Sequence, residues 1–320
     1  MTKPAYSLRL DPWAAEYEGS IQVLDGDEPA AVDTRVEQAA WLAITPPPGP
    51  PPARIAFVDG VRRIEHRLVI EGAGRSAFGL LGSFGVGAVV VERRARVAGA
   101  RTGRVAVAGG GLALEPLLVA VGAAEALVFE PRSEPEDTPM APVDGLQKAM
   151  RQSEAGLAER LSAEVEVVFQ DGPLSFVTRA EGSVVGFVKR LLRAYLEPSA
   201  HALLPRLGKG ERTPLFLIEG REPRYSWYQR IAFGRPIESA LCGVVRLETK
   251  AAAGVDEARR LADLAARELP RFASDATRDP RAPQNLLPIG GLESRLRHLL
   301  GDPTLVRRAI EAHLHGEAVA

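Results

Sequence analysis

Two apolar segments of this chain end in the same way, and together they restrict its fold more than any other feature. They are Phe57-Val58-Asp59-Gly60 and Phe169-Gln170-Asp171-Gly172. Each is short, apolar and closed by Gly, which is typical of a buried strand. An Asp at the carboxyl end of such a strand points into the crevice where sheet proteins bind ligands. The sequence therefore predicts a sheet with two acidic strand ends.

The two acidic ends suggest a metal site. If the strands lie side by side, Asp59 and Asp171 meet, and two carboxylates that close repel each other unless a cation lies between them. Mg²⁺ and Mn²⁺ favour such oxygen ligands. The alternative is that Asp-Gly is simply a frequent turn pair. On these residues alone both interpretations stay open.

The periodicity around these segments predicts an α/β fold with a mixed central sheet and flanking helices. We expect strands at 54–59, 62–71 and 88–97, a helix at 143–163 and a strand at 164–170. The first two strands are expected to form a hairpin at Gly60. Three strands, a helix and a strand ending in Asp follow one another in the order of a ribonuclease H-like fold.

The rest of the chain continues this pattern. We expect helices at 184–196, 256–269, 292–300 and 305–314 and strands at 214–218 and 244–247. Residues 1–52 are predicted to be an N-terminal arm with a Pro-rich linker, because a run of prolines cannot continue a helix or a central strand. Residues 53–302 are predicted to form the main domain, with an insertion at about 100–142, and 303–320 a C-terminal helix and tail.

Glu154 supplies a third carboxylate on the helix that precedes the second acidic strand. It shares one helix face with Met150, Leu157 and Leu161, and an unpaired Glu on such a core-facing stripe would be costly. A metal shared with Asp59 and Asp171 would compensate its charge. A Glu at the edge of the stripe, paired with Arg151 or Arg160, is the alternative. Three acids of this kind suit phosphodiester hydrolysis assisted by two metal ions.

Basic and aromatic residues follow the second acidic strand. Lys189 could hold a scissile phosphate or stabilise charge in the transition state, and Arg190 would extend the phosphate track. A basic surface in solvent is the alternative. Four residues form an aromatic and basic cluster that could stack the bases of a single strand: Tyr225, Trp227, Tyr228 and Arg230. Core packing or a dimer interface is the interpretation that we favour for this cluster.

Composition excludes several classes of protein. The 320 residues are 46% hydrophobic with a formal net charge of -1, so the whole chain has no nucleic-acid signature, although a local basic surface remains possible. Cys242 is the single cysteine, and no apolar stretch resembles a signal peptide or a membrane span. We therefore expect a cytoplasmic protein without a disulfide. No phosphate loop, dinucleotide-binding motif or zinc spacing is present.

Several segments together resemble the NurA nuclease family over about residues 54–300. They are Phe-Val-Asp-Gly at 57–60, the helix that bears Glu154, Val-Phe-Gln-Asp-Gly-Pro-Leu at 168–174, Val-Gly-Phe-Val-Lys at 185–189, Ser-Trp-Tyr at 226–228 and Pro-Gln-Asn-Leu-Leu-Pro-Ile at 283–289. Each piece alone is weak. The set is fairly specific, above all the early Asp-Gly combined with Asp-Gly-Pro-Leu after a strand.

The resemblance implies a ribonuclease H-like homodimer that acts on single- and double-stranded DNA ends with Mn²⁺ or Mg²⁺. The implied activities are 5′–3′ exonuclease and single-strand endonuclease. The implied partner is a hexameric HerA-type ATPase that moves DNA during double-strand-break end resection and recombinational repair. Carried over to this sequence, the metal-binding acids are Asp59, Glu154 and Asp171.

One position departs from the family pattern. Many members have a histidine near the C-terminal helix that helps at the metal site, and Ile289-Gly290 stands at that place here. His298 could replace it only after a register shift. Asp275, Asp279 and Glu293 are other candidates for a fourth ligand.

Two other functions compete with the nuclease. A non-catalytic module that binds DNA ends or the translocase on the same fold would explain the missing histidine. Phosphoryl transfer to a small molecule on the related actin-like fold is a third class. The absence of a second phosphate-binding Gly pattern counts against that last class.

Overall fold

The computed structural model describes residues 31–72, 75–121, 125–178, 183–191, 193–275 and 282–319. The chain divides into two compact units built from interleaved segments. Unit 1 contains the described parts of Met1–Phe57, Val91–Ala95 and Ala158–Gly290. Unit 2 contains those of Val58–Val90, Arg96–Leu157 and Gly291–Ala320. The predicted boundaries at residues 52 and 302 stay a prediction.

Strands and helices alternate along the chain. The strands are β1 (Val32–Asp33), β2 (Ile55–Gly72), β3 (Arg75–Val91), β4 (Ala95–Ala108), β5 (Leu117–Val121), β6 (Glu125–Ser133), β7 (Val167–Asp171), β8 (Val184–Val188), β9 (Phe216–Ile218), β10 (Arg224–Arg230) and β11 (Val244–Lys250). The helices are α1 (Ala141–Leu161), α2 (Pro198–His201), α3 (Val255–Glu268), α4 (Leu287–Leu299) and α5 (Pro303–Val319), with short 3₁₀ turns at Leu204–Arg206, Ala251–Ala253 and Leu269–Arg271.

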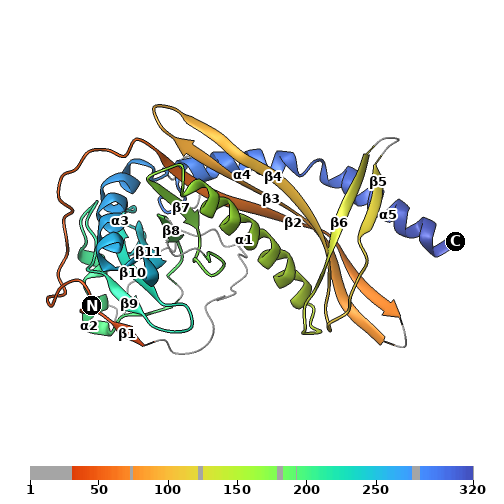
Figure 1. The fold of residues 1–320 in the computed structure, drawn as a ribbon, viewed down its shortest axis with the longest axis horizontal. Helices are drawn as coiled ribbons and strands as arrows, with labels where there is room; N and C mark the ends of the chain where they lie inside the picture. Colours follow the sequence, from red (N-terminus) through yellow and green to blue (C-terminus); the bar gives the residue numbers. More distant parts are fainter. Residues whose placement is uncertain are drawn as a thin grey trace, which may run out of the picture. The chain divides into compact units, whose positions relative to one another are not determined.

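Unit 1 has a mixed sheet in the order β1-β9-β10-β11-β8-β7, followed by the start of β2. The β7–β8 pair is parallel, whereas β8–β11, β11–β10, β10–β9 and β9–β1 are antiparallel. The helix α3 packs on β10 (Figure 1). It buries Leu261 and Leu264 against the core that contains Trp227 and Leu247. Acidic residues in its first turn and Arg267 in its last turn complement the helix dipole.

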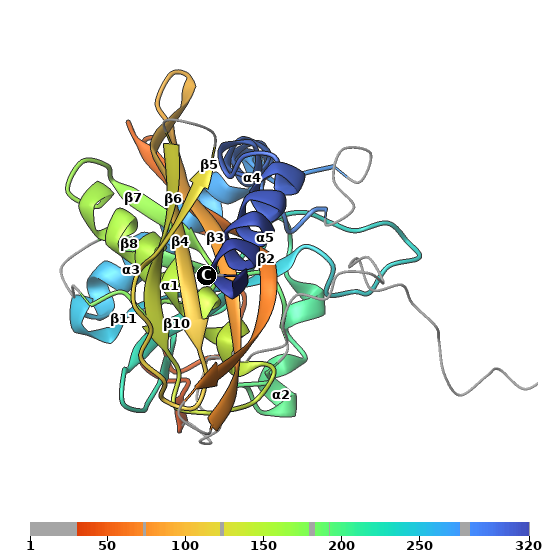
Figure 2. The same ribbon diagram turned by 90° about the vertical axis from the view of Figure 1, so that its right-hand side faces the viewer.

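Unit 2 has the strand order β2-β3-β4-β6-β5, in which β4–β6 is parallel and β6–β5 antiparallel. The helix α1 packs on β3, where Leu146 lies against Gly82. The helix α4 packs on the opposite face of β3, because Leu296 and Leu292 lie against Gly85 and Gly87, which have the opposite parity in the strand. The helix α5 packs on β5 (Figure 2), with Val306 and Ile310 in the core.

The expected hairpin at Gly60 is wrong, because β2 continues without a break from Ile55 to Gly72. The third expected strand at 88–97 is also wrong in its bounds: β3 ends at Val91 and β4 begins at Ala95. The glycines of β3 lie inside the strand, where the missing side chains let the leucines of α1 and α4 approach.

The expected helix at 184–196 is wrong as well. Residues Val184–Val188 form β8, which pairs parallel to β7. Gly186 lies so close to the neighbouring chain that a Cβ there would be 2.9 Å from the carbonyl oxygen of Gly172. A strand that packs this tightly needs glycine, and the two β-branched residues before it favour extended backbone.

Most of the other expected elements are confirmed. The helices α1, α3, α4 and α5 and the strands β7, β9 and β11 lie at the predicted places. The fold is α/β with a mixed sheet and flanking helices, as expected. Five strands, β2–β6, precede α1, where three were expected, and β7, which ends at Asp171, follows it; β5 and β6 lie within the expected insertion at about 100–142. None of the helices in the described ranges is both long and apolar enough to cross a membrane.

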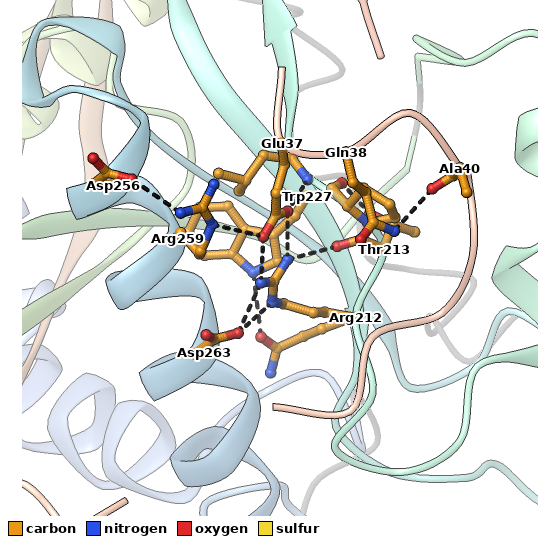
Figure 3. Close-up of polar contacts among 12 residues, drawn as sticks. Glu37, Gln38, Ala40, Arg212, Thr213, Trp227, Asp256, Arg259 and Asp263 are labelled. Atoms are coloured by element: carbon orange, nitrogen blue, oxygen red, sulfur yellow. Dashed lines mark hydrogen bonds and ion pairs between the residues drawn. The ribbon is translucent and has the colours of Figure 1, made fainter. Parts of the chain in front are cut away.

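A buried ion cluster connects the segment 31–45 to the rest of unit 1 (Figure 3). Arg212, with 1% of its side chain exposed, donates two hydrogen bonds to Glu37 at 2.8 and 2.9 Å and one to Asp263 at 2.8 Å. Glu37 also accepts the backbone N–H of Leu215 at 2.7 Å. Burial raises the pKa of Glu37, but the hydrogen bonds and charge of Arg212 more than offset that effect, so its pKa lies below the ordinary value. The predicted arm is thus part of the fold from residue 31, and Trp13 and Tyr17 lie outside the described residues.

We expect Glu37→Gln to lower the free energy of unfolding by about 2 kcal/mol near neutral pH, since it removes charged hydrogen bonds. A carboxylate whose pKa is lowered by folding stabilises the fold above its ordinary pKa and loses that effect as the pH falls. The difference from the wild type should therefore shrink below roughly pH 4. Urea denaturation across this pH range measures it.

Asp256→Asn is the matched control, because Asp256 forms an ion pair with Arg259 at 2.9 Å on the same helix with 90% of its side chain exposed. It should cost less than about 1 kcal/mol. Equal losses in the two variants would contradict a special role of the buried cluster.

Candidate functional site

Asp59 and Gly60 lie within β2, in the part of the strand that belongs to unit 2. Asp59 is buried, with 4% of its surface exposed. The strand forms here because the residues before Asp59 are apolar and β-branched or aromatic, as the sequence predicted. A carboxylate buried to this extent must be compensated by donors or cations.

Glu154 is fully buried on α1 in the same unit. Its Oε2 accepts a hydrogen bond from Arg151 at 2.9 Å, so the ion pair expected as the alternative is present. Its Oε1 lies against β2, where a Cβ placed on Gly60 would be only 2.5 Å away. Gly60, the residue that follows Asp59, therefore makes room for the Glu154 carboxylate. Two of the three predicted acids thus belong to unit 2, and Glu154 lies on the face of β2 to which Gly60 points, whereas adjacent residues of a strand point to opposite faces.

Asp171 and Lys189 are brought together in unit 1. The Lys189 ammonium donates to Asp171 Oδ2 at 2.6 Å and to the amide oxygen of Asn285 at 2.7 Å. The side chain of Asp171 is 18% exposed and that of Lys189 is 9% exposed, and Asn285 is fully buried. Lys189 follows β8 and not a helix, because residues 184–188 are extended. Asn285 lies in the Pro-Gln-Asn-Leu-Leu-Pro-Ile segment, but no role was predicted for it.

The aromatic cluster divides between the surface and the core. Trp227, Tyr228 and Arg230 are at most 2% exposed on β10, whereas Tyr225 is half-buried. Arg230 donates to the backbone oxygens of Leu207 and Cys242. The burial of these three residues agrees with the packing interpretation and leaves them no exposed surface on which a base could stack. Arg190, the other predicted DNA contact, is half-buried after Lys189.

The candidates for a fourth ligand differ in exposure. Gly290 lies in α4, Glu293 is buried and bonded to Arg297 at 3.0 Å, and His298 and Asp275 are exposed. Asp279 lies outside the described residues.

Cys242 is a buried thiol, as the apolar sequence around it suggested. Burial, followed by its hydrogen bond to Glu238, raises its pKa to about 12. A thiol that remains protonated at neutral pH is a poor nucleophile. Cys242 is therefore not a candidate catalytic nucleophile.

The donor set on β2 and α1 fits a hard divalent cation. Asp59 and Glu154 both offer buried carboxylate oxygens, which are the ligands that such a cation prefers. In the part of the chain that the structure describes, no three His, Cys, Asp or Glu side chains gather as a ready metal cluster. A metal bound by Asp59 or Glu154 would therefore need ligands from further side chains.

Comparison with solved structures gives a likeness to a nuclease. Neither a protein-family model nor a curated protein matches the sequence. The chain is similar to the crystal structure of the NurA nuclease from Sulfolobus solfataricus, with a TM-score of 0.49 and 10% sequence identity, over 87% of this chain and 88% of that one. A function for this chain has to rest on its own residues.

We expect Gly60→Ala to lower the free energy of unfolding by about 2 kcal/mol, because the new methyl group would overlap Glu154 and Met150. Gly291→Ala is the control. It lies on an exposed turn of α4 with nothing within 4 Å of a Cβ, so it should stabilise the helix by about 0.5 kcal/mol. Chemical denaturation measures the free energy of unfolding of both variants and distinguishes the expected decrease from the expected increase. A neutral Gly60→Ala would show that α1 does not press against β2 there.

Proposed function

We propose that this chain is a divalent-metal-dependent DNA nuclease in which Asp59, Glu154 and Asp171 supply the metal-binding carboxylates. The observation that supports it best is the pair of buried acids in unit 2, with Glu154 packed against Gly60, the residue after Asp59. A cation beside them would compensate charge that is otherwise costly to bury.

The position of Asp171 in β7 is the reason for including it among the metal-binding acids. In unit 1, Phe57 stacks on Phe169 with ring centroids 5.5 Å apart. Asp59 and Asp171 each follow two residues later in their own strands, and side chains two residues apart point to the same side of a strand. This pattern supports the proposal that both acids serve one reaction.

Mn²⁺ or Mg²⁺ bound by these oxygens would lower the pKa of a bound water and stabilise a leaving oxygen in phosphodiester hydrolysis. Lys189 would hold the scissile phosphate, with Asn285 orienting its ammonium group through the 2.7 Å hydrogen bond. In the structure as it stands, Lys189 neutralises Asp171. Arg190 would extend the contact along the backbone, and Tyr225 is the aromatic residue of the predicted cluster that is not fully buried.

The finer parts of the proposal come from the motif resemblance. They are 5′–3′ exonuclease and single-strand endonuclease action, a hexameric HerA-type ATPase as partner, a homodimer, and a cytoplasmic role in end resection and recombinational repair. Single- and double-stranded DNA ends would be the substrates.

A non-catalytic module that binds DNA ends or the translocase is the second candidate. It is favoured by Gly290, which stands where the family pattern has a histidine. Purified protein that binds DNA but does not cut it with either metal, alone or with the translocase, would favour this candidate.

We expect Asp59→Asn to reduce Mn²⁺-dependent cleavage of single-stranded DNA by at least about 100-fold, because it removes a charged metal ligand. Mn²⁺ should also raise the melting temperature of the wild type, since a ligand that binds only the folded state stabilises it. That rise should be smaller in the variant.

Asp256→Asn is the control for this experiment as well, because it removes an equal charge from an exposed site on α3. It should keep both cleavage and the Mn²⁺ effect. A folded Asp59→Asn protein that cuts as fast as the wild type would rule out the proposed role of Asp59.

A further inference from the structure

Glu248 is a fully buried acid on β11 that none of the motifs predicted. Its Oε1 accepts the backbone N–H of Leu174 at 2.8 Å and lies 3.3 Å from Arg224. Its Oε2 accepts a hydrogen bond from Arg246 at 2.5 Å. A carboxylate with three donors, two of them cationic, is strongly held in one orientation.

The backbone group that Glu248 binds belongs to the turn after Asp171. In register, Glu248 lies opposite Gly186 on β8, and Gly186 lies opposite Gln170 on β7. A Cβ on Gly186 would be 2.9 Å from the Gly172 oxygen and 3.0 Å from both Glu248 Cγ and Leu174 Cγ. The turn at Asp171–Leu174 therefore rests directly on Gly186 and Glu248.

The other side of Glu248 reaches the segment after Lys189. Arg246, which Glu248 holds, places its guanidinium 4.8 Å from the ring centre of Tyr195. Arg193 lies 5.1 Å from the same ring centre. Such cation–π contacts fix an aromatic side chain without burying a second acid. One buried carboxylate thus connects the two chain segments that follow Asp171 and Lys189.

We propose that Glu248 is the positioning residue of this site: it fixes the turn after Asp171 and, through Arg246, the segment after Lys189. The inference rests on the proposed function for its chemical meaning. The physical basis is that the carboxylate of Asp171 is at the end of a strand, so its direction depends on the backbone that follows it. Glu248 holds that backbone at Leu174, three residues later.

A merely structural role must be distinguished from positioning. Glu238 offers a matched control in the same unit, since it is also buried, at 8% exposure. It accepts the backbone N–H of Arg235 at 2.6 Å and the Arg235 side chain at 2.8 Å. Its partners lie in the segment between β10 and β11, and none of them is a predicted site residue. Glu238→Gln should therefore lower stability without affecting the Asp171 turn.

The test compares full-length wild type, Glu248→Gln and Glu238→Gln in two measurements. Hydrogen exchange followed by mass spectrometry reports local opening of residues 167–178, with no need for metal or activity. The Mn²⁺ concentration that gives half of the thermal stabilisation reports the metal site. We expect exchange in 167–178 to be about tenfold faster, and the Mn²⁺ midpoint about tenfold higher, in Glu248→Gln only.

Glu248→Asp is a second variant, which keeps the charge but withdraws the carboxylate by one methylene. It should open the same segment, and it keeps the test decisive if Glu248→Gln does not fold. Exchange in 167–178 equal to that of Glu238→Gln would overturn the inference. If the segment opens as expected but Mn²⁺ has no effect on the wild type, the positioning of the turn stands and the metal-dependent function fails.

Discussion

Burying a carboxylate is costly unless cations or several donors compensate it, and the polar interior of both units follows from this constraint. Glu37, Glu154 and Glu248 are each almost or fully buried, and each is bonded to arginine. Glu37 and Glu248 bond to residues far away in sequence, and Glu154 packs α1 against β2. Acids of this kind act as fixed points around which the neighbouring strands and helices are arranged, so the same residues that would serve chemistry also determine local geometry.

The sequence contained the main elements of the fold because apolar periodicity is a local signal. The strand before Asp171 and the helix that carries Glu154 lie where the periodicity predicted them. Gly60 misled the prediction, because it was interpreted as a turn although β2 continues through it. A glycine signals either a turn or a close approach of another chain segment, and only the tertiary neighbour decides between them.

The candidate site could be predicted only in part, for a related reason. Asp59, Asp171 and Lys189 each lie at the end of a largely apolar run of residues, so their positions are visible in the sequence. Asn285 and Glu248 have no such signal, because their contacts to Lys189 and Leu174 span 96 and 74 residues. Trp227 is fully buried, in agreement with the packing interpretation that the sequence favoured for the aromatic cluster.

The unbroken course of β2 has a consequence for how this protein can vary. Side chains alternate along a strand, so one residue inserted or lost between Phe57 and Asp59 would turn the acid to the opposite face and replace Gly60 beside Glu154. A hairpin would absorb such a change in its loop, whereas a continuous strand transmits it along its length. Sequence drift in this part of the chain is therefore restricted to substitutions, and changes in length belong to the ends of the strand.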